Sequence, residues 1–577
     1  MIKNILKNLF FHISKTRKIQ LLILLIITLF ASIVEMLSVA SVVPFVKAAT
    51  SENFFLETFS IFKSVKINNK DEAILITGIV FSFLILINSL LRCALIYVTA
   101  KLSNIITAEL SIKIYRASLF DSYSNHINKK TSTIISAVTQ KVYQTFFTIS
   151  SIITFVSSAF ILIALISILI WINPKVMFFF IIFFSVLYLA IVLFGKKTLK
   201  KNSQIINEEQ NKIVLNLQNG LGAFRDVILD KTQDYYISIF AKANLNKARR
   251  EAINNIIQNS PRYILEGAGT ILVVVLIIFW NYFLDNSNKI LEVFPILAAL
   301  AIGAQKILPL INSLYLNFSI FKGNVYQIEE VINVLNRYEE KQKQKKLVKE
   351  KKINFKNLIS FNNVDFSYEN KKEYILENIN LEIEKGSKVG IIGKSGEGKS
   401  TFLDLLTGLL EPKNGIVCVD GIKLSPETLI SWQSKISHVP QKLFLSDNSF
   451  LENIAFGRSI KDIDLKRVES VSKKAQLHKF IMSLKYGYHE QIGERGIKLS
   501  GGQIQRVGLA RSLYKNSEII IFDEATNALD TETERLIMEE LYSLEKNLTI
   551  IIVAHRLKTL SKCDVIFEVK NKKIIKL

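Results

Sequence analysis

The sequence is poor in cysteine, with three residues in 577, and this scarcity excludes several kinds of protein. Cys93, Cys418 and Cys563 stand far apart, so they form neither the framework of a disulfide-rich domain nor a zinc cluster. Modules that combine aromatic and basic residues to bind nucleic acid are also missing, although the formal net charge is +23. We therefore expect no redox chemistry at the thiols and no nucleic-acid partner, and we expect the positive charge to face a membrane surface.

Hydrophobic residues make up 49% of the chain, more than a soluble domain usually carries, and most of the excess precedes residue 320. Six apolar stretches are long enough, at about 20 residues each, to cross a bilayer. They are 21–45, 74–98, 149–171, 176–194, 264–283 and 291–314. We therefore predict an all-α transmembrane domain with six spans over residues 1–325.

A short amphipathic segment, IKNILKNLFFHI, precedes the first apolar stretch. Its apolar residues recur on one helical face, which predicts a helix lying in the membrane interface. These residues are Ile2, Ile5, Leu6, Leu9, Phe10 and Ile13. A secretory signal is the competing interpretation, but the apolar run that follows is too long and has no small-residue cleavage site.

The distribution of Lys and Arg predicts the orientation of the spans. Both residue types gather at the N-terminus and in two long connections, 100–145 and 195–262, which places these segments in the cytoplasm. The two connections are helix-prone and contain little Gly or Pro. Turns are expected near Ser122 and Asn219, each as a short helix facing a soluble domain or as a plain solvated turn.

The longest connection on the opposite side, 47–72, contains the stretch ENFFLETFSIFKSV. Phe55, Phe59 and Phe62 predict a short external amphipathic helix. An apolar loop packed on the neighbouring spans is the alternative.

The pattern changes after a charged run, residues 326–355, which is interpreted as a linker. Residues 356–577 alternate short β-branched strands with Gly-rich turns, which predicts an α/β domain. Within it, KVGIIGKSGEGKST is typical of a strand, a phosphate-binding loop and a helix start. The loop amides can surround a β-phosphate, Lys399 can reach the β- and γ-phosphates, and Ser400 can ligate Mg²⁺. The predicted contacts are Gly393, Ser395, Gly396, Gly398, Lys399, Ser400 and Thr401.

Groups suited to phosphate chemistry follow at the ends of further strands. The apolar run in EIIIFDEAT carries Asp523 to the Mg²⁺ side and Glu524 beside it, so Glu524 is the candidate general base for an attacking water. His555 ends the apolar strand IIIVAH and is expected to contact the γ-phosphate, with a structural histidine as the alternative. Gln441 is expected to sense both Mg²⁺ and the membrane domain, and Tyr368 is expected to stack on adenine.

A second anion site is predicted in LSGGQIQR, well downstream of the first. A serine hydroxyl, two glycine amides and the start of a helix near Gln503 all favour a bound phosphate. The predicted ligands are Ser500, Gly501, Gly502 and Gln503. One chain therefore carries two phosphate-binding motifs.

In their order along the chain, these motifs resemble those of the nucleotide-binding domain of ATP-binding cassette (ABC) transporters. GERG at 493–496 and NALD at 527–530 also resemble family motifs, with Asn527 where serine is commoner. The resemblance implies a P-loop (RecA-like) α/β domain with an antiparallel β subdomain and a helical subdomain. It also implies ATP and Mg²⁺ as cofactors, with Asp530 among the nucleotide contacts. Because the LSGGQ of one cassette closes over the nucleotide of another, a homodimer is the expected working unit.

The fusion of spans and cassette in one chain, spans first, resembles the exporter branch and implies alternating access driven by ATP. Three membrane stretches resemble, more loosely, the bacterial flippases that move polyprenyl-diphosphate-linked oligosaccharides in protein N-glycosylation. These stretches are VEMLSVASVVPFVKAA, SPRYILEGAG and GAQKILPLINS. This resemblance implies a multi-pass protein of the bacterial cytoplasmic (inner) membrane, with its cassette in the cytoplasm. It also implies a lipid-linked glycan as cargo.

Cations in or beside the spans suit a diphosphate, because charge inside a membrane is costly unless it is paired or functional. The tentative substrate contacts are Arg92, Arg262 and Lys306. Structural pairing is the alternative for all three. Glu266 lies one helical turn from Arg262, and Glu35 or Glu292 can neutralise the others.

Other cargoes and other classes of function stay open on the sequence. A lipopolysaccharide precursor, a peptide or a drug is the alternative cargo. A cassette ATPase of DNA repair or translation is disfavoured by the six spans. An ATP-regulated channel keeps the same architecture, and only the absence of flux against a gradient distinguishes it.

Overall fold

The computed structural model describes residues 2–50, 70–128, 131–172, 174–283, 290–347, 350–368, 373–524, 531–543, 547–554 and 560–577. The chain divides into two compact units, which are described separately below. The helical unit comprises Met1–Asp121 and His126–Glu340, and the cassette unit comprises Ser122–Asn125 and Lys341–Leu577. The predicted external segment around Phe55, Phe59 and Phe62 lies outside the described residues.

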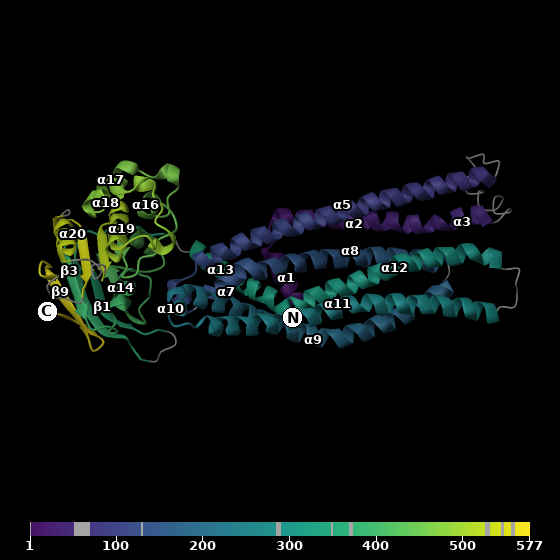
Figure 1. Ribbon diagram of the computed structural model, residues 1–577, viewed down its shortest axis with the longest axis horizontal. Coiled ribbons are helices and arrows are strands. Elements are labelled where there is room, and N and C mark those ends of the chain that lie inside the picture. The colour runs from purple at the N-terminus through teal and green to yellow at the C-terminus, as the bar shows by residue number, and fades with distance from the viewer. Residues whose placement is uncertain are drawn as a thin grey trace. The chain divides into compact units, whose positions relative to one another are not determined.

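The helical unit confirms the expected all-α architecture. Its long helices lie side by side, with α8 packed against α2 and α12, and α9 packed against α11 (Figure 1). A π-helical turn, Ala137–Lys141, joins α7 to α8. The helices from the N-terminus onward are α1 (Ile2–His12), α2 (Lys15–Ala40), α3 (Val42–Thr50), α5 (Lys70–Leu119), α6 (Tyr123–Asn128), α7 (Thr131–Ser136), α8 (Val142–Ile172), α9 (Pro174–Gly222), α10 (Phe224–Leu229), α11 (Gln233–Phe283), α12 (Ile290–Gly323) and α13 (Val325–Leu347).

Part of the predicted set of spans is confirmed by the length and composition of the helices. Among the described residues, four helical stretches are long and apolar enough to cross a membrane. They are Lys15–Ala49, Asp71–Leu119, Thr131–Trp171 and Ile181–Gly222, and they overlap the first four predicted spans. The fifth and sixth predicted stretches are helical, within α11 and α12, and stay predictions as membrane spans.

A one-residue turn at Ser41 interrupts the helix within the first predicted span. Helix α2 ends at Ala40, and α3 begins two residues later at Val42. Pro44 has no N–H group, so it cannot donate to the carbonyl of Ala40 as a helix interior requires. Proline is tolerated in the first turn of a helix, and Pro44 is the third residue of α3.

The N-terminal segment forms helix α1, as its apolar periodicity predicts. Its apolar face is divided between two environments. Ile5, Leu9 and Ile13 are buried in a cluster that includes Ile328 of α13, whereas Phe10 is 51% exposed. The exposed part of the face is what a membrane interface would cover, and that location stays a prediction.

Short helices occupy both turns expected in the long polar connections. Helix α6 follows Ser122, and α10 follows the turn after Asn219. The helical alternative is therefore confirmed over the plain turn. The charged run interpreted as a linker is also helical as far as Leu347, in α13.

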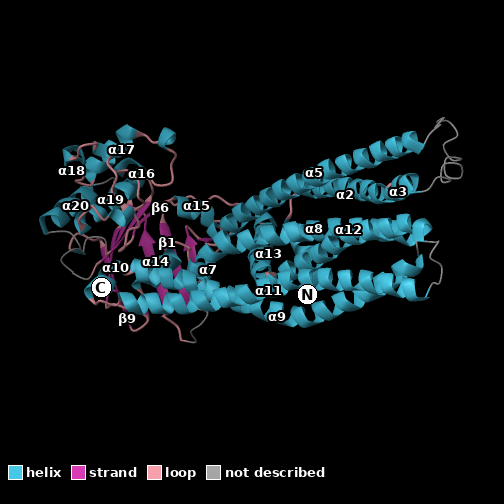
Figure 2. Ribbon diagram, turned by 45° about the vertical axis from the view of Figure 1, so that its right-hand side comes forward, coloured by secondary structure: helices cyan, strands magenta, loops and turns pink. Residues whose placement is uncertain are grey.

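The cassette unit contains two sheets, drawn in magenta in Figure 2. The smaller is antiparallel with strand order β2-β1-β4-β5, and the larger has the order β10-β9-β3-β8-β7-β6. The strands are β1 (Leu358–Phe366), β2 (Leu376–Glu384), β3 (Lys388–Gly393), β4 (Asn414–Val419), β5 (Ile422–Lys423), β6 (Ile436–Val439), β7 (Ile519–Asp523), β8 (Thr549–Val553), β9 (Val565–Lys570) and β10 (Lys573–Lys576). The helices are α14 (Lys399–Leu406), α15 (Leu429–Ser434), α16 (Phe450–Ile454), α17 (Leu465–Lys474), α18 (His478–Ser483), α19 (Gly501–Tyr514) and α20 (Thr531–Ser543). This composition confirms the α/β cassette with an antiparallel β subdomain and a helical subdomain.

The larger sheet is buried on both faces, which explains its continuous runs of isoleucine and valine. Along β7, Ile519 and Ile521 belong to one core cluster, and Ile520 and Phe522 belong to the other. Strands β3, β8, β7 and β6 run parallel, so their carboxyl ends meet at one edge of the sheet. A ligand site is expected at that edge.

Candidate functional site

The parallel strands deliver the predicted phosphate-binding groups to one edge of the cassette sheet. Strand β3 ends at Gly393 and leads into the glycine loop, and β7 ends at Asp523. Gln441 follows the end of β6. Residues far apart in the sequence are thus brought to one edge, as the motifs predicted.

The phosphate loop requires glycine for two distinct reasons. Gly398 has a φ of 107°, a conformation that side chains other than glycine rarely adopt. At Gly393, an added Cβ would lie 2.6 Å from the carbonyl oxygen of Val569. The loop then enters α14, whose exposed N-terminal amides can face a phosphate group.

Lys399 is held across the loop that it follows. Its Nζ donates to the carbonyl oxygens of Gly393 at 2.7 Å and Lys394 at 3.1 Å. Only 6% of the residue is exposed. The ammonium group is therefore held beside the loop where phosphates are predicted, with no side chain standing between it and the loop carbonyls.

Glu524 lies beside Lys399 in a strained backbone conformation. Its φ is 52°, in the left-handed region, and its N–H donates to the carbonyl of Val553 in β8 at 3.1 Å. Its carboxylate accepts a hydrogen bond of 2.6 Å from Nε2 of Gln441 and lies 3.9 Å from Nζ of Lys399. Strain of this kind persists where the surrounding structure enforces a side-chain position, as at catalytic sites.

Asp404 is a site residue that we did not predict. Burial and the nearby charge of Asp523 raise the pKa of Asp404 to about 6. The pKa of Asp523 is also raised, by burial first and then by the charge of Glu524, although Lys399 opposes the shift. Asp404 lies four residues after Ser400 in α14, so helical spacing from the predicted Mg²⁺ ligand is the signal that would have found it.

These carboxylates and the Ser400 hydroxyl supply the oxygen ligands that Mg²⁺ prefers. Burial and the neighbouring charge of Glu524 both disfavour the ionised form of Asp523, and a bound cation would oppose this effect. Ser400 is exposed at the start of α14. The residues present therefore fit a divalent cation.

Tyr368 stands at the far side of the loop. Its hydroxyl lies 3.4 Å from Oγ1 of Thr401, and its ring packs edge-on against Phe366 at 5.2 Å between centroids. Thr401 is buried. These contacts fix the position of the ring, and its stacking on adenine stays a prediction.

The LSGGQ motif forms the N-terminus of α19, which begins at Gly501, slightly earlier than the predicted start near Gln503. Ser500 and Gln503 make a capping box: Ser500 Oγ accepts from the Gln503 N–H at 3.3 Å, and Gln503 Oε1 accepts from the Ser500 N–H at 2.8 Å. The serine oxygen is used as an acceptor, so its O–H remains able to donate to an anion. Ser500 and Gly501 are exposed, while Gly502 and Gln503 are half-buried.

Some predicted residues lie outside the described part of the chain. His555, Asp530 and Asn527 belong to this group. Their roles stay predictions. Ser395 and Gly396 are described and are exposed on the loop.

The predicted membrane cations are brought together only in part. Arg92 and Lys306 both pair with Glu35, at 2.9 Å and 2.8 Å. Arg262 instead pairs with Glu266 on its own helix at 2.8 Å, and both side chains are largely exposed. Each of the three cations is therefore paired in the structure, with Glu35 as the partner of two, and their contact with cargo stays a prediction.

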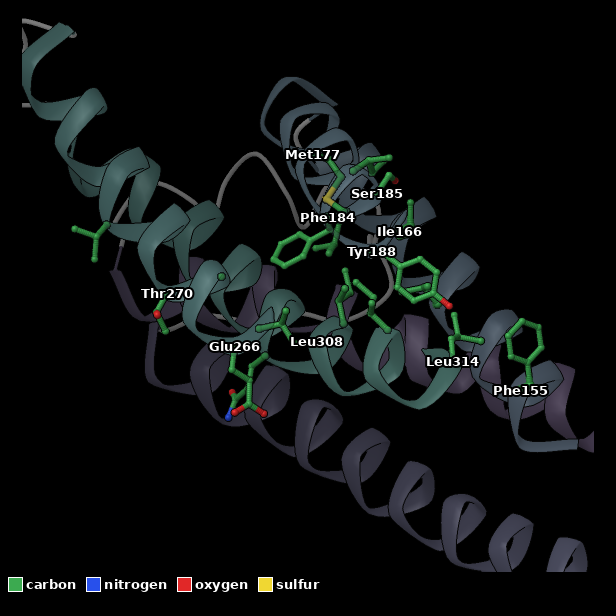
Figure 3. Close-up of a pocket in the computed structure, with 18 residues that line it drawn as sticks. Phe155, Ile166, Met177, Phe184, Ser185, Tyr188, Glu266, Thr270, Leu308 and Leu314 are labelled. Carbon is green, nitrogen blue, oxygen red and sulfur yellow. The ribbon is translucent and has the colours of Figure 1, made fainter. Parts of the chain in front are cut away.

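A cavity of about 890 Å³ lies among α8, α9, α11 and α12 in the helical unit. Its lining is almost wholly apolar, with Glu266 and Thr270 toward one side and Phe155 and Leu314 at the other in Figure 3. Gln305 and Ile307, the neighbours of Lys306, also line it. The size and lining suit a long apolar group.

Two family models match the chain. Residues 19–304 match the ABC transporter transmembrane region, and residues 376–527 match the ABC transporter domain. The first overlaps the predicted spans. The second runs from β2 beyond Glu524 and contains the phosphate loop and LSGGQ.

Two relatives with named roles match over little more than a third of the chain. A Neisseria gonorrhoeae protein named as an ATP-dependent lipid A-core flippase is 42% identical over 217 residues, which are 38% of this chain and 35% of that protein. A Bacillus subtilis protein named for multidrug export is 40% identical over 219 residues, 38% of this chain and 37% of that protein. The chain thus spans little more than a third of the length of these relatives.

A solved structure matches over nearly the whole chain. It is that of a bacterial Atm1-family ABC exporter with ATP bound, with a TM-score of 0.76, 19% sequence identity, and coverage of 97% of this chain and 95% of that one. At this identity the likeness concerns the fold.

Proposed function

Since this chain belongs to the ABC transporters, with a transmembrane region and a cassette in one polypeptide, we propose that it hydrolyses ATP to export an amphiphile. The observation that carries this proposal is the meeting of Lys399, Gln441 and Glu524 at one strand edge. A transporter that uses ATP needs a base, a phosphate-neutralising cation and a sensor in contact, and these residues supply them.

Each group has a role in the proposed hydrolysis. Glu524 removes a proton from a water that attacks the γ-phosphorus. The bond from that phosphorus to the bridging oxygen breaks, and ADP and inorganic phosphate form. Gln441 orients the Glu524 carboxylate through their 2.6 Å hydrogen bond. Lys399 and His555 neutralise charge on the phosphates.

Mg²⁺ would be held by Ser400, Asp523 and Gln441, and when bound it neutralises phosphate charge. Asp404 would stand behind this set as an uncompensated carboxylate. The nucleotide itself would contact Tyr368 and the loop. Asp530 completes the proposed contacts.

The working unit we propose is a homodimer in the bacterial cytoplasmic membrane. One chain carries one phosphate loop and one LSGGQ, and the capping geometry leaves the Ser500 O–H able to donate to a second chain's γ-phosphate. Two chains would then make two composite sites. ATP would hold the cassettes together until hydrolysis removes the γ-phosphate.

The cargo we propose is a polyprenyl-diphosphate-linked oligosaccharide. The cation pair of Arg92 and Lys306 suits a diphosphate, and the apolar cavity of about 890 Å³ suits part of a polyprenyl chain. Arg262, exposed beside that cavity's Glu266, is a third candidate contact. A relative named as a lipid A-core flippase supports the broader class of phosphorylated lipids.

Export of a lipopolysaccharide precursor, a peptide or a hydrophobic drug is the second candidate. The apolar cavity lining and the relative named for multidrug export favour it. Such a cargo needs no diphosphate contact.

The test uses proteoliposomes that contain the full chain and a panel of lipid-linked sugars, lipopolysaccharide precursors and drugs. ATP hydrolysis stimulated by lipid-linked sugars, together with accumulation against a gradient, is the expected result. Stimulation by drugs alone would favour the second candidate. Flux that runs only down a gradient would indicate a channel.

A further inference from the structure

Two cations share one buried carboxylate in the described part of the helix bundle. Glu35 lies on α2, Arg92 on α5 and Lys306 on α12, so the three groups come from three helices. The side chain of Glu35 is 1% exposed, whereas those of Arg92 and Lys306 are 43% and 26% exposed. The carboxylate is therefore enclosed, and both cations remain partly accessible.

Glu35 divides its two oxygens between the cations. Oε2 accepts from Nε of Arg92 at 2.9 Å, and Oε1 lies 2.8 Å from Nζ of Lys306. Lys306 also donates to Oγ of Ser38, which is one helical turn beyond Glu35, at 2.9 Å. These contacts hold a guanidinium and an ammonium group against one carboxylate.

The cluster keeps a net positive charge. Among the residues that the structure describes, no second carboxylate pairs with Arg92 or Lys306. An arginine has five N–H donors and a lysine has three, so Glu35 and Ser38 use only part of this capacity. Uncompensated charge at membrane depth is costly, which favours the binding of an anion.

We propose that Glu35 is an internal counter-ion that competes with the phosphate groups of the cargo for Arg92 and Lys306. This role rests on the lipid-diphosphate cargo proposed above. A diphosphate carries more negative charge than one carboxylate, so it binds the accessible side of both cations. When the cargo leaves, Glu35 again neutralises them.

The competition has a purpose in transport. A site that passes an ion onward must attract it enough to bind and weakly enough to release it. Two unneutralised cations in a membrane would hold a diphosphate too tightly for fast release. Glu35 limits the attraction, because it already neutralises part of the charge on each cation.

Glu35→Gln tests the role because it keeps the size and hydrogen-bonding capacity of the side chain and removes its charge. In proteoliposomes, we expect the apparent KM for a polyprenyl-diphosphate oligosaccharide to fall about tenfold and kcat to fall as release slows. Glu35→Asp, which keeps the charge, should restore values nearer to wild type. Thr28→Ala removes a buried hydroxyl of the same helix, which donates to the carbonyl of Leu24, and is the matched control, with a KM expected within about twofold of wild type.

Direct binding separates this role from a structural one. The purified full chain in detergent is titrated with farnesyl diphosphate and, as the uncharged control, farnesol. Wild type should prefer the diphosphate, and Glu35→Gln should bind it about tenfold more tightly without tighter binding of farnesol. Thermal denaturation without ligand reports whether the variant is folded.

The outcomes distinguish the two proposals. If wild type prefers the diphosphate but Glu35→Gln binds it no more tightly, Glu35 is a structural anchor and its role as a competitor is wrong. If wild type does not prefer the diphosphate to farnesol, the proposed cargo is wrong, and the role of Glu35 is overturned with it.

Discussion

The cassette and the helix bundle use their charged residues in opposite ways. At the strand edge of the cassette, burial first, and then a neighbouring carboxylate, raise the pKa values of Asp404 and Asp523. In the bundle, Arg92 and Lys306 share Glu35, and Arg262 pairs with Glu266. Charge at membrane depth is costly unless it is paired or functional, so the cations of the bundle share a carboxylate, whereas the carboxylates of the cassette stand close to one another. Among the described residues, the cassette site therefore concentrates negative charge, and the Glu35 cluster of the bundle keeps a positive charge.

The largest expected effect comes from removing a charged group of the cassette site. Glu524→Gln keeps the size of the side chain and removes the proposed base, so ATP turnover should fall by about 100-fold or more while ATP still binds. Steady-state phosphate release and nucleotide binding measure the two effects. Lys399→Ala should instead weaken nucleotide binding or hydrolysis through lost charge neutralisation. Full turnover by Glu524→Gln would remove Glu524 from the chemistry.

The next effect depends on which chain carries a change. A mixed dimer with Ser500→Arg in one chain and Lys399→Ala in the other should place both lesions in one composite site and leave the second site intact. Both changes in the same chain should damage both sites. ATP turnover of affinity-purified mixed dimers measures the difference. Equal turnover for the two arrangements would contradict the proposed role of LSGGQ across the dimer.

A smaller effect concerns the bundle side of the comparison. Lys306→Ala should reduce flipping of a lipid diphosphate several-fold, and more than it reduces ATP hydrolysis, because the change lies far along the chain from the catalytic groups. Lys306→Arg should retain much of the flipping, since it preserves the charge. Both rates are measured in the same vesicles. Unchanged flipping by Lys306→Ala would argue against a direct contact with the headgroup.

The smallest expected effect is on stability. The folded state raises the pKa of Asp404 from 3.8 to about 6, so the folded protein holds this proton more tightly than the unfolded chain does. The free energy of unfolding therefore falls as pH rises across this window. Asp404→Asn removes the ionised carboxylate and should raise the unfolding midpoint by a few degrees at pH values above the window. The gain should shrink near the lower end of the window. Thermal denaturation without nucleotide or Mg²⁺ measures this gain. An equal gain above the window and near its lower end would contradict the attribution to the raised pKa of Asp404.

The placement of the cassette groups could be predicted because local signals define it. Asp523 and Glu524 lie at the end of one apolar strand, Lys399 follows the glycine loop after another, and parallel strands bring their carboxyl ends together. The capping serine Ser500 likewise needs only its neighbour Gln503 to form the start of α19. Asp404 was missed because its raised pKa depends on burial in the fold and on the charge of Asp523 at the end of β7.

The membrane site was less predictable for the same physical reason. The pairing of Arg262 with Glu266 follows from helical spacing alone. In contrast, the sequence left Glu35 and Glu292 as equal partners for the other cations, and only the packing of α2, α5 and α12 brings Glu35 against both of them. The turn at Ser41 also depends on a balance between Pro44 and the helix-forming residues on either side of it.

Translocation of a fluorescent polyprenyl-diphosphate oligosaccharide, measured beside ATP hydrolysis in the same proteoliposomes, tests the proposed function most directly. We expect wild type to move this lipid across the bilayer only with ATP and Mg²⁺, and Glu524→Gln to abolish the movement. The same polyprenol with a neutral headgroup should move much more slowly. Wild-type protein that ignores every lipid-linked sugar and exports a neutral hydrophobic drug would contradict the proposed cargo.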